Sequence, residues 1–405
     1  MLSWEYPPRI VGGIARHVEE LSEALVAQGH EIHVITANHP NTLEHETVNG
    51  VHIHRVKSLD FDTPDFLTWV LQLNLGMITY ALEQHRATPF DVVHAHDWLV
   101  AHAGVSLKKG LGVPLLATIH ATEVGRNKGL LTSEMSKYIN QMEWFLGFEA
   151  WRVIVCSQYM DREIKHAFHV PADKIDVIPN GIKLSKFDAN RMSPEDAKQF
   201  RRHLATDDQK IVFFVGRMVH EKGAQILLEA VPGVLAAVPD ARFVVVGKGG
   251  FLSDLRRRAH ELGVSPYVNF TGFVSDEDLL RILQVIDVAV VPSLYEPFGI
   301  VALEGMATGK PTVVADAGGL PEVVEHTKSG ITTYSGNKDS LSWGILEALK
   351  NKEYGRVLGT NARKRVEEVF NWNVIATATG KVYDRIVKEN APEAQKEAKT
   401  KVGKK

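Results

Sequence analysis

The sequence predicts an α/β protein made of two doubly wound parallel sheets, and three observations lead to this prediction. Short apolar runs alternate with segments of helical periodicity along most of the chain. A more polar stretch, residues 182–207, separates an earlier series of these runs from a later one. The chain of 405 residues is also longer than a single hydrophobic core usually supports, so two domains are expected.

The earlier series supplies six expected strands, separated mostly by helical patterns. These strands cover residues 1–5, 31–36, 51–56, 91–96, 113–119 and 152–156. After the first strand, Gly12 and Gly13 open a helix in which Ile14, Val18 and Leu21 recur at helical spacing. Adjacent glycines let a ligand approach the backbone, and the amides at a helix start favour phosphate. Gly12 and Gly13 are therefore candidate phosphate-binding residues.

The later series supplies six more strands, again short and apolar. They cover residues 210–216, 242–247, 267–271, 287–292, 311–315 and 330–334. A closing helix is expected over residues 371–388, and the apolar-poor tail 389–405 is expected to be disordered or a frayed helix. The predicted domains are residues 1–183 and residues 184–370.

One strand-to-helix connection is especially suited to an anionic ligand. The apolar strand 287–292 is followed by a turn at Gly299, and a helix is expected from Ile300. The amides at the start of that helix, together with its dipole, favour a phosphate. Glu296 precedes the helix and Glu304 lies one turn into it, and carboxylates in such positions can accept hydrogen bonds from several hydroxyls. The arrangement suits a nucleotide sugar.

Two cations follow the strand 210–216. Ligands of open α/β sheets bind outside the carboxyl ends of the strands, where Arg217 and Lys222 are expected. An arginine offers a planar fork and a lysine a compact charge, so the two can hold a diphosphate leaving group.

Histidines follow two strands of the first domain. His96 and Asp97 end one strand, and His120 ends the next. His94 and His96 share one face of their strand, so a zinc site is an alternative. No further cysteine or acidic ligand lies at tight spacing, and His94 is better explained as a hydrogen-bonded residue of the sheet.

Several ordered motifs resemble those of one enzyme family. They are PPRIVGG at 7–13, HAHDW at 94–98, PNG at 179–181, VGR at 215–217, EKG at 221–223 and YEPFGI at 295–300, with Glu304. Together they resemble the retaining glycosyltransferases of the GT-B fold, the superfamily of glycogen and starch synthases and sucrose synthase. The resemblance extends from Ser3 to about Val387. It implies two Rossmann-like domains facing each other across a cleft, with the helix 371–388 crossing back onto the first domain.

The resemblance also implies roles for the matching residues. The residues that would bind the donor are Gly12, Gly13, Arg217, Lys222, Gly299, Ile300 and Glu304. The residues that would carry catalysis are Glu296, His120, Arg217 and Lys222. In this interpretation Glu296 positions donor hydroxyls, and His120 forms a hydrogen bond with a hydroxyl of the reacting sugar. His96 and Asp97 would lie on the acceptor side.

No metal ion and no cofactor are expected to be required. The Asp-x-Asp pattern, which holds a metal in other glycosyltransferases, occurs at Asp60 and Asp62 and again at Asp276 and Asp278. The second pair begins a helix capped by Ser275, and the first lies in a loop without a phosphate-binding companion.

The expected activity is transfer of a hexose, with glucose the expected sugar, from ADP-glucose or UDP-glucose to an acceptor hydroxyl. Elongation of an α-1,4-glucan, as by a glycogen synthase, is the preferred interpretation. Enzymes that make disaccharides, sugar phosphates or glycolipids are the alternatives within the family. A sugar-nucleotide epimerase of the same fold would need no acceptor, and a glycan-binding module would not need two cations and two glutamates around one phosphate site.

Composition excludes several other classes. Apolar residues make up 44% of the chain and charged residues 23%, and a net charge of −3 offers nothing to attract nucleic acid. Cys156 is the only cysteine, so no internal disulfide can form. No N-terminal charged segment precedes an apolar run of signal-peptide length, and no stretch approaches the roughly 20 apolar residues of a membrane span. A cytoplasmic enzyme is expected, with a nucleotide sugar and a hydroxyl acceptor as its partners.

Overall fold

The computed structural model describes residues 1–57, 63, 65–189 and 191–391, and the chain divides into two compact units. Unit 1 is Met1–Gly181 with the segment from Trp372 onward, and unit 2 is Ile182–Asn371. The two-domain α/β class predicted from the sequence is therefore confirmed. Asp60, Asp62 and most of the expected tail lie outside the described residues.

Unit 1 is built on an eight-stranded sheet with the order β3-β4-β2-β1-β5-β6-β7-β8. Its strands are β1 (Leu2–Ser3), β2 (His33–Ala37), β3 (His45–Val48), β4 (Val51–Val56), β5 (Val93–His96), β6 (Leu115–Ile119), β7 (Arg152–Val155) and β8 (Ile175–Val177). All neighbours are parallel except β3 and β4, which form a hairpin at one edge through Asn49 and Gly50. The strands β3 and β8 were not predicted from the sequence.

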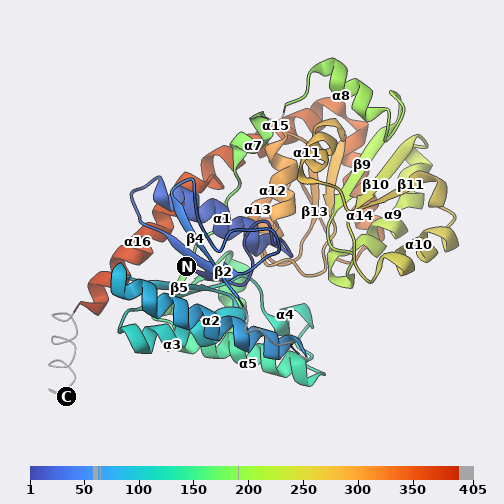
Figure 1. The fold of residues 1–405 in the computed structure, drawn as a ribbon. Coiled ribbons are helices and arrows are strands. Elements are labelled where there is room, and N and C mark those ends of the chain that lie inside the picture. The colour runs from blue at the N-terminus through green and yellow to red at the C-terminus, as the bar shows by residue number, and fades with distance from the viewer. Residues whose placement is uncertain (58–62, 64, 190, 392–405) are drawn as a thin grey trace. The chain divides into compact units, whose positions relative to one another are not determined.

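Helices cover both faces of this sheet. They are α1 (Gly13–Val26), α2 (Phe66–Ala87), α3 (Ala101–Leu111), α4 (Glu123–Arg126), α5 (Glu134–Glu149), α6 (Gln158–Phe168) and α16 (Trp372–Asn390), with the short 3₁₀ turns η1 (Trp98–Val100) and η2 (Ala172–Lys174). Figure 1 shows α2, α3 and α5 together in one layer and α1 beside α16. The closing helix thus packs in unit 1, as the family resemblance implied.

The return of the chain to unit 1 is fixed at Trp372. Its indole Nε1 donates to a carboxylate oxygen of Glu20 on α1 at 2.5 Å. Its ring fills the space beside Gly181, where a Cβ would lie 2.6 Å from a ring atom. Trp372, Ile375 and Ile386 are buried in the same core as residues of α1. Removing this apolar area from water stabilises the docked helix.

Unit 2 is built on a six-stranded parallel sheet with the order β11-β10-β9-β12-β13-β14. Its strands are β9 (Lys210–Val215), β10 (Ala241–Val246), β11 (Val268–Gly272), β12 (Val288–Val291), β13 (Thr312–Ala315) and β14 (Ile331–Thr333). Its helices are α7 (Leu184–Ala189), α8 (Pro194–Arg201), α9 (Ala224–Ala237), α10 (Leu252–Glu261), α11 (Asp276–Val285), α12 (Ile300–Ala307), α13 (Leu320–Val323), α14 (Lys338–Lys350) and α15 (Lys352–Val369), with the turns η3 (His220–Lys222) and η4 (Ser265–Tyr267).

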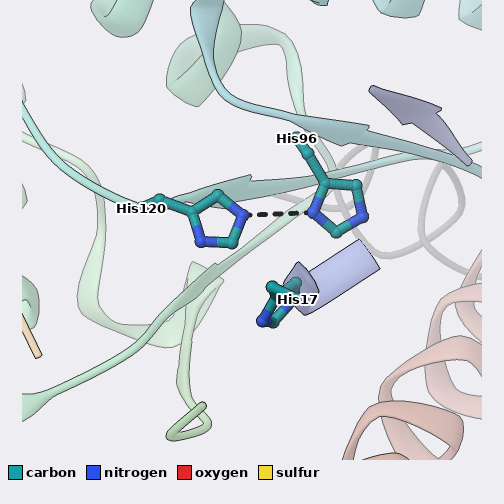
Figure 2. Close-up of side chains that lie close together, drawn as sticks. All are labelled: His17, His96 and His120. Atoms are coloured by element: carbon teal, nitrogen blue, oxygen red, sulfur yellow. Dashed lines mark hydrogen bonds between the residues drawn. The ribbon is translucent and has the colours of Figure 1, made fainter. Parts of the chain in front are cut away.

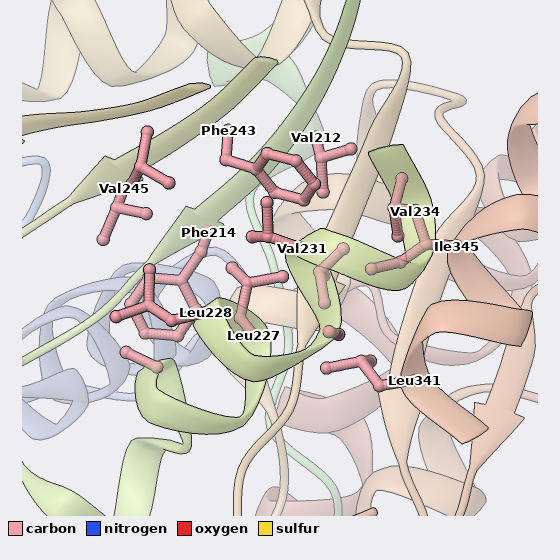
Figure 3. Close-up of a cluster of buried hydrophobic side chains, with 14 of the residues drawn as sticks. Val212, Phe214, Leu227, Leu228, Val231, Val234, Phe243, Val245, Leu341 and Ile345 are labelled. Atoms are coloured by element: carbon pink, nitrogen blue, oxygen red, sulfur yellow. The ribbon is translucent and has the colours of Figure 1, made fainter. Parts of the chain in front are cut away.

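The strands of unit 2 are apolar on both faces because helices cover both. Along β9, Val212 and Phe214 belong to the core cluster formed with α9 and α14 (Figure 3). The alternate residues Ile211 and Phe213 belong to a second cluster with α11. Successive side chains of a strand point to opposite faces, so a strand buried on both sides becomes a continuous apolar run. This is the pattern that made the later series of strands recognisable in the sequence.

A network of imidazoles joins β4 to its neighbours in unit 1. His54 Nε2 lies 2.9 Å from His33 Nδ1, and His54 Nδ1 lies 2.7 Å from the hydroxyl of Tyr80 and 3.3 Å from His45 Nδ1. Burial, followed by the nearby His33, His45 and His52, lowers the pKa of His54 to about 3. The folded protein therefore holds His54 neutral at pH values where the unfolded chain protonates it.

We expect unit 1 to lose stability as the pH falls below about 6.5, the ordinary pKa of histidine. Between that value and about 3, the unfolded state binds a proton at His54 that the folded state does not bind. Such a group contributes up to about 1.4 kcal/mol per pH unit within this window. Urea unfolding followed by circular dichroism should show a smaller loss of stability from about pH 7 to about pH 5 in His54→Gln than in the parent.

The control for this experiment is His166→Gln, which removes an exposed histidine on α6. That variant should keep the pH dependence of the parent. An unchanged pH dependence in His54→Gln would show that His54 is protonated in the folded protein as readily as in the unfolded one.

Candidate active site

The loops that follow β9 and β12 are joined directly in unit 2. These strands are neighbours where the strand order reverses, which is where open α/β sheets bind ligands. The carbonyl oxygen of Glu221 accepts hydrogen bonds from the amides of Leu294 (2.8 Å) and Tyr295 (3.4 Å). Gly223 has φ +72°, and a Cβ there would lie 1.9 Å from the carbonyl oxygen of Pro292. A side chain at residue 223 would therefore push the two loops apart.

This backbone contact brings Lys222 to Glu296. Lys222 Nζ lies 2.8 Å from Glu296 Oε2, and Ser293 Oγ donates to the same oxygen at 3.2 Å. The two charged side chains are 22% and 11% exposed, so the pair is far less hydrated than a surface salt bridge. The main chain of Glu296 is fixed as well, because its carbonyl oxygen accepts from the amide of Gly319 at 2.9 Å. Gly318 allows this contact, since a Cβ there would lie 1.9 Å from that oxygen.

Arg217 differs from Lys222 in its exposure. Its side chain is 55% exposed, and its guanidinium lies 3.7 Å from the carboxylate of Glu221. A pair at that distance and exposure binds weakly, so the guanidinium can turn to another anion at little cost.

Helix α12 begins directly after Gly299. Its first amides have no partner within the helix, and the helix dipole adds a positive potential at the same end. Ile300 is half-buried there, and Glu304 lies one turn further on, with only 8% of its surface exposed. The start of α12 thus has donors for an anion, with one carboxylate at the entrance and another within the helix.

In unit 1, the turn at Gly12 and Gly13 is held by a carboxylate. Glu5 Oε2 accepts from the amides of Val11 (2.6 Å) and Gly12 (3.0 Å). Glu5 is almost wholly buried, and burial raises its pKa, opposed by these two amides. Helix α1 then starts at Gly13. The amide expected to meet a phosphate at Gly12 therefore donates to Glu5 in this structure, and phosphate binding at Gly12 and Gly13 stays a prediction.

Three imidazoles meet at the carboxyl ends of β5 and β6. His96 Nδ1 lies 3.2 Å from His120 Nε2, and the ring of His17, on α1, lies 4.6 Å from that of His120 and 5.5 Å from that of His96 (Figure 2). Burial is the main cause that lowers the pKa of all three, that of His120 to about 3 and those of His17 and His96 well below the usual value. The rings are therefore neutral near pH 7.

Asp97 fixes the main chain of His120. Its Oδ1 accepts a hydrogen bond from the amide of His120 at 2.7 Å. Burial raises the pKa of Asp97 to about 6, opposed by this amide and by Arg126. Asp97 itself has φ +63° and ψ 174°, a backbone conformation that is costly for any residue other than glycine. The strain is stored next to the histidines, in a position typical of functional sites.

The next turn of unit 1 is also held by a buried acid. Both carboxylate oxygens of Glu143, on α5, accept from the amide of Glu123, at 3.0 and 2.9 Å. Burial raises the pKa of Glu143 well above its ordinary value. The short helix α4 is thereby fixed immediately after the loop that carries His120.

His94 and Ser275, two residues considered in the sequence alternatives, both form hydrogen bonds. His94 is fully engaged, with Nδ1 2.8 Å from the hydroxyl of Tyr383 and Nε2 2.7 Å from the hydroxyl of Thr118, as expected for a residue of the sheet. Ser275 caps α11 by accepting from the amide of Asp278 at 3.1 Å, which explains the acids at that helix start.

The predicted site residues fall into two sets, one in each unit. Unit 2 brings Lys222 and Glu296 into contact, and unit 1 brings His96, Asp97 and His120 together. His17 and Glu5 were not predicted as site residues from the sequence. The position of His17 could have been predicted, because it lies one turn after Gly13 in a helix that follows the first strand.

Comparison with known proteins gives consistent results for both units. The family model of Glycosyltransferase Family 4 matches residues 11–186, and that of Glycosyl transferases group 1 matches residues 195–365. An uncharacterized glycosyltransferase of Methanocaldococcus jannaschii is 40% identical over 390 residues, covering 95% of this chain and 97% of that relative. A glycogen synthase of Mycobacterium tuberculosis is 33% identical over 399 residues, covering 95% and 93%.

A solved structure agrees with these sequence relatives. Sucrose-phosphate synthase from Thermosynechococcus elongatus has a TM-score of 0.78 and 27% identity, over 93% of this chain and 94% of its own. Relatives of this similarity along nearly the whole chain establish the family. The chain therefore belongs to the glycosyltransferases of the GT-B fold, in the group of families 4 and 5.

Proposed function

We propose that the protein is a retaining glycosyltransferase that transfers glucose from ADP-glucose or UDP-glucose to an acceptor hydroxyl, extending an α-1,4-glucan. The observation that carries the proposal is the contact between Lys222 and Glu296 beside the start of α12. A cation, a carboxylate and a helix start in one place match a substrate that has both a diphosphate and sugar hydroxyls. The similarity to a glycogen synthase supports the choice of glucan as the acceptor.

The main electrostatic demand in this reaction is the negative charge that grows on the departing diphosphate. Lys222, Arg217 and the amides near Gly299 are the groups of unit 2 that can stabilise it. Fixed donors and cations contribute most when they are already oriented before the reaction. Lys222 meets this condition because its ammonium group is held by Glu296.

Glu296 has a second role in the proposal. As the bond from the anomeric carbon to the diphosphate breaks, the sugar becomes cation-like, and a carboxylate that is mostly removed from water stabilises it. Glu296 also accepts hydrogen bonds from donor hydroxyls, while Glu304 holds the ribose of the nucleotide. Ile300 and Gly299 provide the surface and the amides at the entrance of the helix.

The residues of unit 1 are assigned to the sugar and the acceptor. His120 forms a hydrogen bond with a hydroxyl of the transferred sugar, and a neutral imidazole can either donate or accept there. Asp97 is a positioning residue, because it acts through the amide of His120. His96 and Asp97 are on the acceptor side, and Gly12 and Gly13 approach the donor once the anion has displaced Glu5 from the amides of Val11 and Gly12.

The chemical step balances without a metal. The bond between the anomeric carbon and the diphosphate oxygen breaks, and a bond to the acceptor oxygen forms on the same face of the sugar. The acceptor loses its proton to the departing diphosphate. Exclusion of water protects the activated sugar from hydrolysis.

A second candidate is transfer to a small sugar phosphate, which is favoured by the similarity to sucrose-phosphate synthase. Product analysis separates the two candidates. The protein is incubated with ADP-glucose or UDP-glucose and either a malto-oligosaccharide or a hexose phosphate. Longer oligosaccharides support the glucan proposal, and a phosphorylated disaccharide supports the second candidate. A modified nucleotide sugar formed without any acceptor would instead show an epimerase.

We expect Lys222→Gln to lower kcat by about 10²-fold or more, because it removes one of the charges that stabilise the leaving group. Glutamine keeps a donor for Glu296, so the fold should be retained. Steady-state kinetics with the donor and acceptor identified above provide the measurement, and thermal unfolding checks the fold.

The matched control is Lys328→Gln, which changes a lysine of unit 2 that is 77% exposed and pairs with Glu325 at 3.7 Å. This variant should keep the kcat of the parent. A kcat for Lys222→Gln within a few-fold of the parent would remove Lys222 from the phosphate site.

We also expect transfer to continue after treatment with EDTA. Lys222 and Arg217 supply positive charge without a metal, and Asp276 and Asp278 are accounted for as the first turn of α11. Initial rates are measured before and after dialysis against the chelator. Loss of activity that manganese or magnesium restores would show that an acid pair holds a required cation.

A further inference from the structure

The cluster of His17, His96 and His120 contains ring nitrogens that form no hydrogen bond with the described residues and that the proposed contact of His120 with the sugar does not use. Neither ring nitrogen of His17 has a hydrogen-bond partner in the described part of the chain, and the same holds for Nε2 of His96. Both residues are more than nine-tenths buried. Unpartnered polar atoms are costly inside a protein unless something satisfies them. Figure 2 shows the three rings close together, carried by α1, by the end of β5 and by the residue that follows β6.

The spacing of these nitrogens fits a transition metal. One ligand atom from each histidine lies within 4.8 Å of the other two. Zinc binds imidazole nitrogen at about 2.0–2.1 Å with tetrahedral angles, which places two ligand nitrogens roughly 3.3 Å apart. The 3.2 Å between His96 Nδ1 and His120 Nε2 already matches one edge of such a site. A rotation of the His17 side chain would complete the third position. The ring makes no hydrogen bond of normal geometry with any residue that the structure describes, and the only polar side chain whose interaction raises its pKa is Asn180.

We propose that His17, His96 and His120 form a binding site for Zn²⁺ or a similar borderline transition metal, with a fourth position open to water or an anion. Neutral imidazole is a preferred ligand of such ions. Asp97 fixes the backbone of His120, one of the three ligands, by accepting a hydrogen bond from its amide. Three histidines with one open position are a known zinc arrangement.

Besides the rotation of His17, binding requires a change of tautomer in the pair that now shares a hydrogen bond. His96 must carry its N–H on Nε2, and His120 on Nδ1, so that His96 Nδ1 and His120 Nε2 both present lone pairs to the metal. His96 Nε2 is free for that proton. No proton is gained or lost by the protein in this step.

The site predicts inhibition by zinc. This consequence rests on the proposed function, in which His120 meets the transferred sugar. A metal held by Nε2 of His120 removes that nitrogen from the sugar, so zinc and substrate compete. Metal binding itself does not depend on the proposed function, because the fold of unit 1 brings the three histidines together without any substrate.

The chain offers a matched control in a second group, Glu31, His33 and His52. There His33 Nε2 lies 3.1 Å from Glu31, and His33 Nδ1 lies 2.9 Å from His54. His52 Nδ1 lies 3.1 Å from the hydroxyl of Thr47. These nitrogens are largely occupied, so this group should be the poorer metal site. It contains two imidazoles where the proposed site contains three.

The test uses Co²⁺ as a probe, since tetrahedral cobalt absorbs visible light much more strongly than hexahydrated cobalt. The full-length protein is titrated with Co²⁺ alone. We expect one equivalent to give the tetrahedral spectrum in the parent and in His52→Gln. His17→Gln and His96→Gln should bind at least roughly tenfold more weakly, by analogy with the loss when a weaker outer-shell contact is removed. An unchanged spectrum in His17→Gln, loss of the spectrum in His52→Gln, or no tetrahedral spectrum in the parent would overturn the proposal.

A second measurement uses the parent protein alone and is independent of how the variants fold. X-ray absorption of the protein with one equivalent of Zn²⁺ should count three imidazole ligands, and a count of two or fewer would contradict the site.

Transfer assays then test inhibition. Zinc should lower the rate in the parent and in His52→Gln, with recovery after EDTA. If the protein shows the cobalt spectrum but transfers no sugar, the metal site is supported and the proposed function is contradicted. Full activity with zinc bound would contradict the competition between zinc and substrate.

Discussion

The proposed donor site of unit 2 depends on the contact between the loops that follow β9 and β12. Two amides of the later loop donate to the carbonyl oxygen of Glu221, and Gly223 has no side chain to keep the loops apart. Lys222 and Glu296 are consequently neighbours although 74 residues separate them. Their pairing keeps a cation and a carboxylate oriented in a partly dry place, where their charges act more strongly than in water.

The histidine cluster of unit 1 depends on burial, whereas the site of unit 2 depends on an ion pair. His17, His96 and His120 are kept neutral because burial lowers the pKa of each imidazole, and His17 and His96 also have neighbouring imidazoles that add to the effect. Asp97 adopts a strained backbone conformation and holds the amide of His120. Neutral imidazoles serve both proposals for this cluster, since they can form hydrogen bonds with a sugar or bind a metal. The two uses exclude each other at His120 Nε2, which is why zinc should inhibit.

Much of the fold could be predicted because strands buried on both faces leave continuous apolar runs. The strand β8 is short and half-buried, so it left no such run. The hairpin of β3 and β4 was missed although Asn49 and Gly50 are a typical turn pair. For the candidate site, the sequence indicated which residues follow the strands but not which side chains they contact. The pair of Lys222 with Glu296, the capture of Gly12 by Glu5 and the approach of His17 depend on tertiary packing, which periodicity does not record.

The central claim is that unit 2 binds the nucleoside diphosphate between the loop after β9 and the start of α12. A crystal structure of the protein with bound ADP or UDP tests it most directly. We expect the diphosphate to bind against Lys222, Arg217 and the amides near Gly299, with the ribose at Glu304. A nucleotide bound elsewhere, with Lys222 still paired only to Glu296, would contradict it.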